Sequence, residues 1–196
     1  MVQGWAGDKV RLVALDRSRH LDNAVAWFND PEVTAWTLVG DWPLCRLAEE
    51  EFFAVAERAS PFATPTDVFL AVETTAGEHI GFTGVHRIDW RHGVGLTGTV
   101  IGRKDLWRRG YGGDAVRVRT AYAFDVLGLR LLLSEAFADN EASQRMLLRV
   151  GCREVGRIPE RYFKRGAWRD VVEFACRYDW WTAARDDRAA ARYHGR

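Results

Sequence analysis

The chain has 196 residues and a formal net charge of +1, and hydrophobic residues make up 47% of it. This length and composition suit one globular domain with its own core, and the small net charge gives no general drive toward nucleic acid or an anionic membrane. No apolar run approaches the length of about 18 residues that suggests a transmembrane helix. Residues 1–8 lack the basic and apolar regions of a signal peptide, so we expect a cytoplasmic protein.

The cysteines and histidines predict neither disulfides nor a metal site. Cys45, Cys152 and Cys176 are odd in number and widely spaced, unlike a disulfide framework or a zinc pattern. We interpret them as small buried side chains. The five histidines show no ligand spacing such as H-E-x-x-H.

Strands dominate the early part of the chain, and one β-α-β-α unit lies in the middle. In chain order, hydrophobic periodicity predicts a strand at 9–15, helices at 21–29 and 46–59, strands at 68–73, 79–88 and 96–102, a helix at 114–127, a strand at 129–137, a helix at 141–150, and strands at 153–163 and 168–178. Asp30-Pro31 ends the first helix, and Gly128 and Gly151 end the last two. The pattern indicates an α+β fold with a mixed, mainly antiparallel sheet.

Two further expectations concern the ends of this pattern. The helix at 46–59 is expected to bury Leu47, Phe52, Val55 and Ala56. The domain is expected to span residues 1–181. Residues 182–196 are rich in alanine and arginine and are expected to form a short helix or a frayed tail.

A glycine-rich segment connects the strand at 96–102 to the next helix. Residues 107–115 have the sequence W-R-R-G-Y-G-G-D-A. Glycines at a helix start present several backbone N–H groups to one point, where the helix dipole favours an anion. Arg108 and Arg109 add charged donors that suit phosphate oxygens. We interpret the segment as a pyrophosphate site; the alternative is a plain turn beside two solvated arginines.

Two nucleotide-binding motifs were compared with this segment. A P-loop requires Gly-Lys-Ser/Thr where Gly112-Gly113-Asp114 stands, which excludes it. The pattern Gly110-x-Gly112-x-x-Ala115 fits the dinucleotide motif G-x-G-x-x-G/A, and Glu135 lies downstream. However, that motif follows its strand directly, whereas residues 103–109 intervene here. A dinucleotide-binding protein therefore stays as a rival interpretation.

Three segments in this order resemble the GNAT superfamily, the Gcn5-related acyl-CoA N-acetyltransferases. Residues 107–115 look like its motif A, and residues 140–156 look like its Asn-x-x-Ser…Lys-x-Gly-Phe segment. Residues 166–172 are similar to the closing hairpin of its ribosomal-protein (Rim-type) and polyamine acetyltransferase subgroups. The resemblance spans about residues 10–181. It implies a single-domain GNAT fold, in which helices flank a mixed sheet whose central parallel strands are splayed.

The resemblance implies acetyl-CoA as the acyl donor, lying between splayed strands at 96–102 and 131–137. Pantetheine is expected to pair with free backbone groups of Val100, Ile101 and Gly102, and Asn140 to orient it or to cap the following helix. The residues expected to hold the pyrophosphate are Arg108, Arg109, Gly110, Tyr111, Gly112 and Gly113. Asp114 is expected to be structural rather than catalytic.

The resemblance also implies catalytic roles, with departures from the family pattern. Many members protonate the leaving thiolate with a tyrosine, where this chain has Leu147. Ser143 occupies the position that the ribosomal-protein subgroup uses for that role, although it can equally serve the helix end. Relatives often carry a glutamate as base early in the central strand, and this chain has Leu96 nearby. His86 and Glu135 are fallback bases, with a solvent-facing histidine and a paired carboxylate as their plainer interpretations.

The acceptor is expected to be a cationic amine, either a peptide N-terminus or a small molecule. The region that forms the acceptor wall in this family carries aromatic and acidic side chains: Trp36, Asp41, Trp42, Glu49, Glu50 and Glu51. Residues 49–51 can instead be the exposed side of a helix. We therefore expect an acetyl-CoA-dependent N-acetyltransferase that acts through a ternary complex as a homodimer. The alternative is an acetyl-CoA-binding sensor or interaction domain without efficient turnover.

Overall fold

The computed structural model describes residues 5–57 and 64–194. Its centre is one seven-stranded sheet in the order β1-β2-β3-β4-β5-β7-β6. All neighbouring strands pair antiparallel except β4 and β5, which are parallel. The mixed, mainly antiparallel α+β fold is therefore confirmed.

The elements follow the predicted order with shifted ends, apart from a short helix at Pro31–Thr34 and a 3₁₀ turn at Lys104–Leu106, which were not predicted. The strands are β1 (Val10–Ala14), β2 (Val68–Thr74), β3 (His79–Asp89), β4 (Val94–Ile101), β5 (Leu131–Phe137), β6 (Arg153–Lys164) and β7 (Ala167–Arg177). The helices are α1 (Arg17–Phe28), α2 (Pro31–Thr34), α3 (Arg46–Glu57), α4 (Tyr111–Ala121), α5 (Glu141–Arg149) and α6 (Tyr178–His194), with a 3₁₀ turn η1 (Lys104–Leu106) and a π turn η2 (Tyr122–Val126). Residues 58 and 59 of the second predicted helix, and most of the loop at 60–66, lie outside the described residues.

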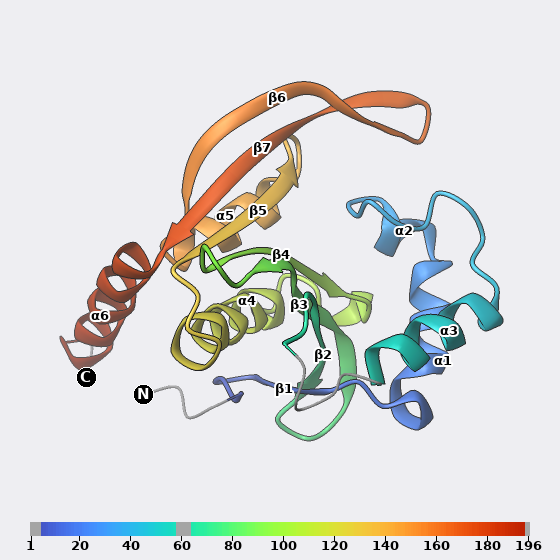
Figure 1. Ribbon diagram of the computed structural model, residues 1–196, viewed down its shortest axis with the longest axis horizontal. Helices are drawn as coiled ribbons and strands as arrows, with labels where there is room; N and C mark the ends of the chain where they lie inside the picture. Colours follow the sequence, from blue (N-terminus) through green and yellow to red (C-terminus); the bar gives the residue numbers. More distant parts are fainter. Residues whose placement is uncertain (1–4, 58–63, 195–196) are drawn as a thin grey trace.

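The two faces of the central strands have different neighbours. Thr83 and Thr99 bond to each other on the face where Arg119 of α4 reaches Thr99. Because side chains alternate along a strand, Phe82 of β3 points to the opposite face. There it packs against Phe28 of α1, with ring centroids 5.8 Å apart. Helices α4 and α5 thus cover one face and helices α1 and α3 the other, as Figure 1 shows.

A buried carboxylate anchors α1 to the sheet. Glu73 of β2 is fully buried and pairs with Arg11 of β1 and with Arg19 and His20 of α1. Beside it, the Nε2–H of His79 donates to the Gly81 carbonyl at 2.9 Å, and burial lowers the pKa of His79 to about 4. A neutral histidine fits this site because burial disfavours the charged form, and the neighbouring His20 and Arg19 act in the same direction.

The predicted buried face of α3 is wrong. Leu47 and Val55 are 62% and 71% exposed, and Phe52 is exposed too, whereas Phe53 is fully buried and Glu49 is 6% exposed. Residues 49 and 53 are one helical turn apart, so they define the face that meets α1 and β3. The pattern misled because apolar side chains occur on both faces of this helix. Cys45 was also expected to be buried and is exposed, whereas Cys152 and Cys176 are buried as expected.

Strands β6 and β7 form a long arm that arches toward α2 at its tip (Figure 1). Its turn at Arg165 and Gly166 has positive φ at both residues, +51° and +83°, as a tight hairpin requires. The buried Lys164 at the tip pairs with Asp41 at 2.7 Å. Arg165 donates to Thr34 at 2.8 Å. These contacts join the arm to the segment between α2 and α3.

Helix α6 begins at Tyr178 and therefore crosses the expected boundary between residues 181 and 182. Trp181 on its first turn is 1% exposed and belongs to the main core cluster. Across the described ranges, no helix is long and apolar enough to cross a membrane.

Candidate active site

The central strands separate at one defined point. Strands β4 and β5 pair in register from Val94 and Leu131 to Thr97 and Ser134, and the pairing stops there. Strand β4 continues to Ile101 and β5 to Phe137. The two strands are thus splayed beyond Thr97, as the sequence analysis expected. Gly98 is the first β4 residue without a partner on β5.

The splayed end of β4 leads to the start of α4. Helix α4 begins at Tyr111, with Gly110 as its N-cap at φ +88°. The first intrahelical bond runs from the Asp114 N–H to the Gly110 carbonyl. Within the described ranges, no protein acceptor meets the N–H groups of Tyr111, Gly112 and Gly113, as is usual for a first helical turn. These donors converge at the positive end of the helix dipole and can hold a phosphate.

The glycines have distinct roles in this turn. Arg108 also has positive φ, +61°, a conformation that is uncommon outside glycine and that recurs at functional sites. A Cβ on Gly112 would lie 3.0 Å from the Met146 sulfur of α5, so α5 packs closely there. A Cβ on Gly113 would meet nothing within 4 Å. The space above Gly113 is therefore open to a ligand.

Positive charge surrounds the helix start. The side chains of Arg108 and Arg109 are exposed and, within the described residues, make no hydrogen bond or ion pair. Lys9 lies beside them, with its ammonium 5.4 Å from the centre of the Tyr111 ring. Sequence analysis missed Lys9, since nothing in the sequence links it to a helix about a hundred residues away.

Asp114 has a structural role, as expected. Its carboxylate accepts the backbone N–H groups of Lys9 and Val10 at 2.8 and 3.1 Å and pairs with Arg117. The Asp114 carboxylate therefore attaches the first strand to the start of α4. Both of its oxygens are used in these contacts.

The backbone at the end of β4 differs from the expectation at two residues, Gly102 and Val100. The Gly102 N–H donates to the Ile80 carbonyl at 2.9 Å, so it is not a free group for pantetheine. The Ile101 carbonyl accepts the Trp107 indole N–H at 2.7 Å. Because backbone groups of a strand point alternately to its two sides, the N–H of Ile101 faces the splayed edge and that of Val100 faces β3. A Cβ on Gly102 would lie 1.9 Å from the ring of Trp27, so α1 packs directly on this backbone.

Helix α5 borders the other side of the splay. The side-chain oxygen of Asn140 accepts the Ser143 N–H at 3.1 Å, which confirms Asn140 as the helix cap. The Ser143 hydroxyl has no partner in the described part of the chain and is half-buried. Leu147, at the position of the family's tyrosine, is 5% exposed and lies in the core. Ser143 is thus the hydroxyl that α5 offers near the splay.

The two fallback bases lie in different surroundings. Glu135 of β5 accepts the Tyr162 hydroxyl at 2.9 Å and pairs with Arg161 at 2.9 Å, so it is a paired carboxylate. His86 of β3 does not face solvent freely: its side chain is 31% exposed, and burial lowers its pKa below the ordinary value. Asp67 lies 3.7 Å from its Nδ1.

The four acidic residues expected at the acceptor wall lie in different environments. Asp41 is paired with Lys164, Glu50 is half-buried and Glu51 is exposed. Glu49 is buried, and within the described residues its carboxylate makes no hydrogen bond or ion pair. Burial raises the pKa of Glu49 above its ordinary value. Trp36 lies over Arg169 at 5.6 Å, while Trp42 is 69% exposed.

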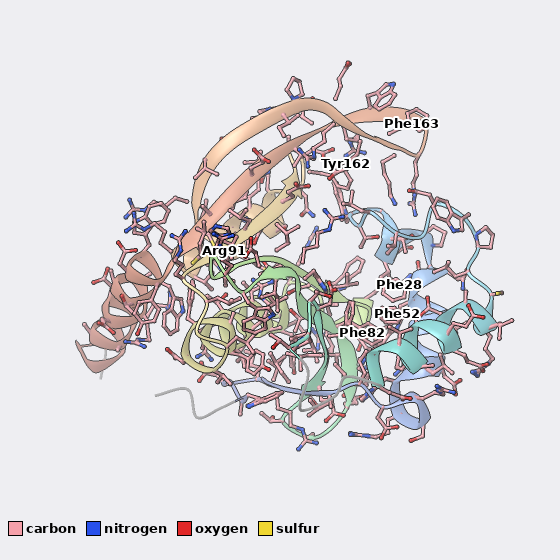
Figure 2. The ribbon with its side chains drawn as sticks, in the orientation of Figure 1. Phe28, Phe52, Phe82, Arg91, Tyr162 and Phe163 are labelled. Carbon is pink, nitrogen blue, oxygen red and sulfur yellow. The ribbon has the colours of Figure 1, made fainter. Side chains whose placement is uncertain are left out.

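Aromatic side chains gather between these elements. Figure 2 shows Phe28, Phe52 and Phe82 together beside α1 and α3, and Tyr162 and Phe163 on the β6–β7 arm. A separate surface cavity of about 450 Å³, lined by Arg130, Leu131, Arg177, Tyr178 and Asp179, lies at the opposite end of β5 from the splay. It takes no part in this site.

A family model described as an acetyltransferase (GNAT) domain matches residues 9–153. The chain belongs to the GNAT acetyltransferase family. The match covers the splay, the glycine turn and α5, and acetyl-CoA is the acyl donor of this family. The fold also argues against the dinucleotide-binding interpretation. In the dinucleotide motif the glycines follow their strand directly, whereas here the turn η1 separates β4 from the glycines and the sheet is mainly antiparallel.

Several known proteins are similar to this GNAT chain. An uncharacterized N-acetyltransferase, YoaA of Bacillus subtilis (strain 168), is 32% identical over 89 residues, which are 45% of this chain and 50% of that protein. The chain thus matches about half the length of this curated relative. The structure of a GCN5-related N-acetyltransferase from Brucella melitensis is similar with a TM-score of 0.75 at 26% identity, covering 97% of this chain and 85% of that one.

The fold also matches a polyamine-acetylating enzyme. Spermidine N-acetyltransferase from Vibrio cholerae, crystallised with CoA and spermine, has a TM-score of 0.79 at 17% identity, covering 88% of this chain and 98% of that one. At this identity the likeness is one of fold. Among the described residues, no group of three or more His, Cys, Asp or Glu side chains could hold a metal ion.

Proposed function

We propose that this chain transfers the acetyl group of acetyl-CoA to a primary amine, which attacks the thioester directly in a ternary complex. One observation carries this proposal: β4 and β5 separate at Gly98, and the opening leads to the unpaired N–H groups of residues 111–113. A pantetheine arm fits such an opening, and a pyrophosphate fits its end.

The residues around the splay suggest how the donor is held. Pyrophosphate would contact the N–H groups of residues 110–113, with Arg108, Arg109 and Lys9 around it. The N–H of Ile101 would pair with pantetheine, and the amide nitrogen of Asn140, which has no partner within the described ranges, would orient it. Ser143 would protonate the leaving thiolate, since its hydroxyl has no partner among the residues that the structure describes.

The acceptor would be a peptide N-terminus or a small cationic amine. Glu49 is the strongest support, because a buried carboxylate without a partner gains most from a bound ammonium group. Phe28 and Phe82 lie on the same side of the sheet and add aromatic faces that favour cations. The spermine bound to the Vibrio cholerae enzyme is an amine of this class.

A sensor or interaction domain is the second candidate. Leu147 favours it, because a buried leucine replaces the tyrosine that many relatives use as an acid. This candidate predicts binding of acetyl-CoA without release of free CoA. The expected homodimer and cytoplasmic location also remain predictions, and sedimentation of the purified protein would test the first of them.

The experiment has two stages. Thermal unfolding is first measured with acetyl-CoA, CoA and NAD; acetyl-CoA and CoA should raise the midpoint and NAD should not. Release of free thiol is then measured with peptides, polyamines and aminoglycosides. If acetyl-CoA binds but no acceptor leads to release of free thiol, the sensor or interaction domain is favoured. No shift with acetyl-CoA would overturn both candidates.

A further inference from the structure

We infer that His86 is the general base of the transfer and that Asp67 positions it; this inference rests on the proposed function. The first observation is its place in the sheet. His86 pairs in register with Leu96 of β4, which lies near the place where relatives often carry a glutamate as base. Strand β4 thus lacks the carboxylate, and the imidazole of His86 on the adjacent strand β3 lies beside that place.

The imidazole lies beside the point where β4 and β5 separate. A Cβ on Gly98 would have the His86 Nε2 at 3.7 Å and no other atom within 4 Å. Gly98 is the first β4 residue without a partner on β5, so the space beside Nε2 is where an acceptor amine would approach a thioester held in the splay. The side chains of Phe82 and His86 lie on the same face by strand alternation. That face is the one toward α1 and α3, from which we expect the acceptor.

Two glycines make room for this ring. A Cβ on Gly84 would lie 2.6 Å from Cε1 and 2.9 Å from Nε2 of His86, so any side chain at Gly84 would displace the imidazole. The Phe69 ring, 4.9 Å from the imidazole centre, supports its other side. The ring thus lies beside the pair Gly84 and Gly98, which are partners in the β3–β4 register.

An irregularity of β3 also aims the side chain. The register shifts between His86 and Asp89, and Arg87 adopts φ +48°. Bulges of this kind redirect side chains and are frequent beside active sites. The Asp67 carboxylate holds the bulge, since its Oδ1 accepts the Arg87 N–H at 3.1 Å and lies 3.7 Å from the His86 Nδ1. A proton on Nδ1, toward Asp67, leaves Nε2 as the acceptor.

The charged groups around His86 agree with a neutral base. Burial lowers its pKa, Asp67 opposes this, and Arg87 and Arg119 act in the same direction as burial. Arg119 lies on the α4 face, fully buried, with its Nη1 3.5 Å from the Gly98 carbonyl. The base form of His86 is therefore present at neutral pH and is lost as pH falls through its lowered pKa.

The proposed reaction is a nucleophilic substitution at the thioester carbonyl. A neutral amine nitrogen forms a bond to the thioester carbonyl carbon, and the carbon–sulfur bond breaks. The surplus proton on nitrogen passes to His86 Nε2. The CoA thiolate takes a proton from Ser143, which solvent restores, and His86 releases its proton to solvent. The products are the N-acetyl amine and free CoA.

The test is the pH dependence of thiol release, with an acceptor found active on the wild-type protein. His86→Gln should lower kcat by about a hundredfold or more, as loss of a general base does. In the wild type, the rate should fall at acidic pH as His86 becomes protonated; this part of the pH–rate profile, the acidic limb of His86, should be absent in the variant. Asp67→Asn should shift that limb to lower pH, because Asp67 raises the pKa of His86. Protonation of the acceptor amine also lowers the rate at acidic pH. Comparing two acceptors whose amines differ in pKa distinguishes the two effects, since only the amine's limb shifts from one acceptor to the other.

Controls keep the inference distinct from the proposed function. Glu135→Gln should leave the acidic limb in place, and His86→Ala should recover activity with added imidazole. The acetyl-CoA shift in unfolding temperature should be unchanged in all four variants, which shows that they fold and bind. An active wild type with an unchanged acidic limb in His86→Gln would overturn the role of His86. An inactive wild type would overturn the proposed function instead.

Discussion

The two sides of the site are built differently. The cofactor half, which comprises β4, α4, β5 and α5, is a continuous segment of chain and presents backbone groups at Ile101 and residues 111–113. The proposed acceptor half comprises α1, α2, α3 and the β6–β7 arm. Contacts between side chains distant in sequence, such as the pair Lys164 and Asp41, hold these elements together. Backbone sites depend on glycine and helix geometry, whereas side-chain sites depend on packing. The cofactor half is therefore the more readable from sequence.

The largest expected effect tests the packing of the acceptor half. Phe53→Ala should lower the free energy of unfolding by about 3–5 kcal/mol, since Phe53 is fully buried. Leu47→Ala on the same helix should change it by less than about 0.5 kcal/mol, because Leu47 is 62% exposed. Urea unfolding of both variants measures this. Equal losses would contradict the observed orientation of α3.

Gly113→Trp should abolish acetyl-CoA binding without unfolding the cofactor half. Apart from its chain neighbours and the backbone of its own helix, a Cβ there meets no atom of the described residues within 4 Å, so the tryptophan would occupy the proposed ligand space. Acetyl-CoA at a hundred times its Kd should stabilise the wild type by about 2.7 kcal/mol and the variant not at all. Val126→Trp, at a site that is 54% exposed, is the matched control and should keep the full shift. A normal shift in Gly113→Trp would place the cofactor elsewhere.

Glu49→Gln should affect the acceptor and leave the cofactor untouched. We expect the acceptor KM to rise about tenfold or more, since a hydrogen bond to a charged group contributes about 1.5–3 kcal/mol. The pKa of Glu49 is raised, so the free protein gains stability from this residue at low pH and loses it as pH rises through that pKa. A bound cation favours the carboxylate, so KM in the wild type should rise as pH falls through the same pKa. Glu51→Gln, at an exposed position, should change neither quantity.

The smallest expected effect compares two helix caps. Asn140→Ala and Asp16→Ala each remove a side-chain acceptor from a helix start, so each should cost about 1 kcal/mol of stability. Only Asn140 borders the splay, so only Asn140→Ala should also reduce the rise in unfolding temperature that acetyl-CoA produces. Calorimetry with and without acetyl-CoA separates the two losses. A weakened shift in Asp16→Ala would show that the halves are not independent.

The order of the main strands and helices, the α+β class and the glycine turn could be predicted from the sequence alone. Periodicity and turn residues act over a few positions, so they can be recognised along the chain. The helix cap at Asn140 and the helix ends at Gly128 and Gly151 belong to the same class of local signal, and the two glycines have φ of +69° and +99°.

The tertiary structure decided which groups face one another. It placed Lys9 beside Tyr111, turned Phe53 rather than Phe52 to the core, joined Gly102 to Ile80 and brought Asp67 to His86. The bulge after His86 and the packing of two glycines beneath its ring depend on strand register, which arises between segments and not within one. Contacts between distant segments form only when the sheet assembles, and local patterns of sequence carry no record of them.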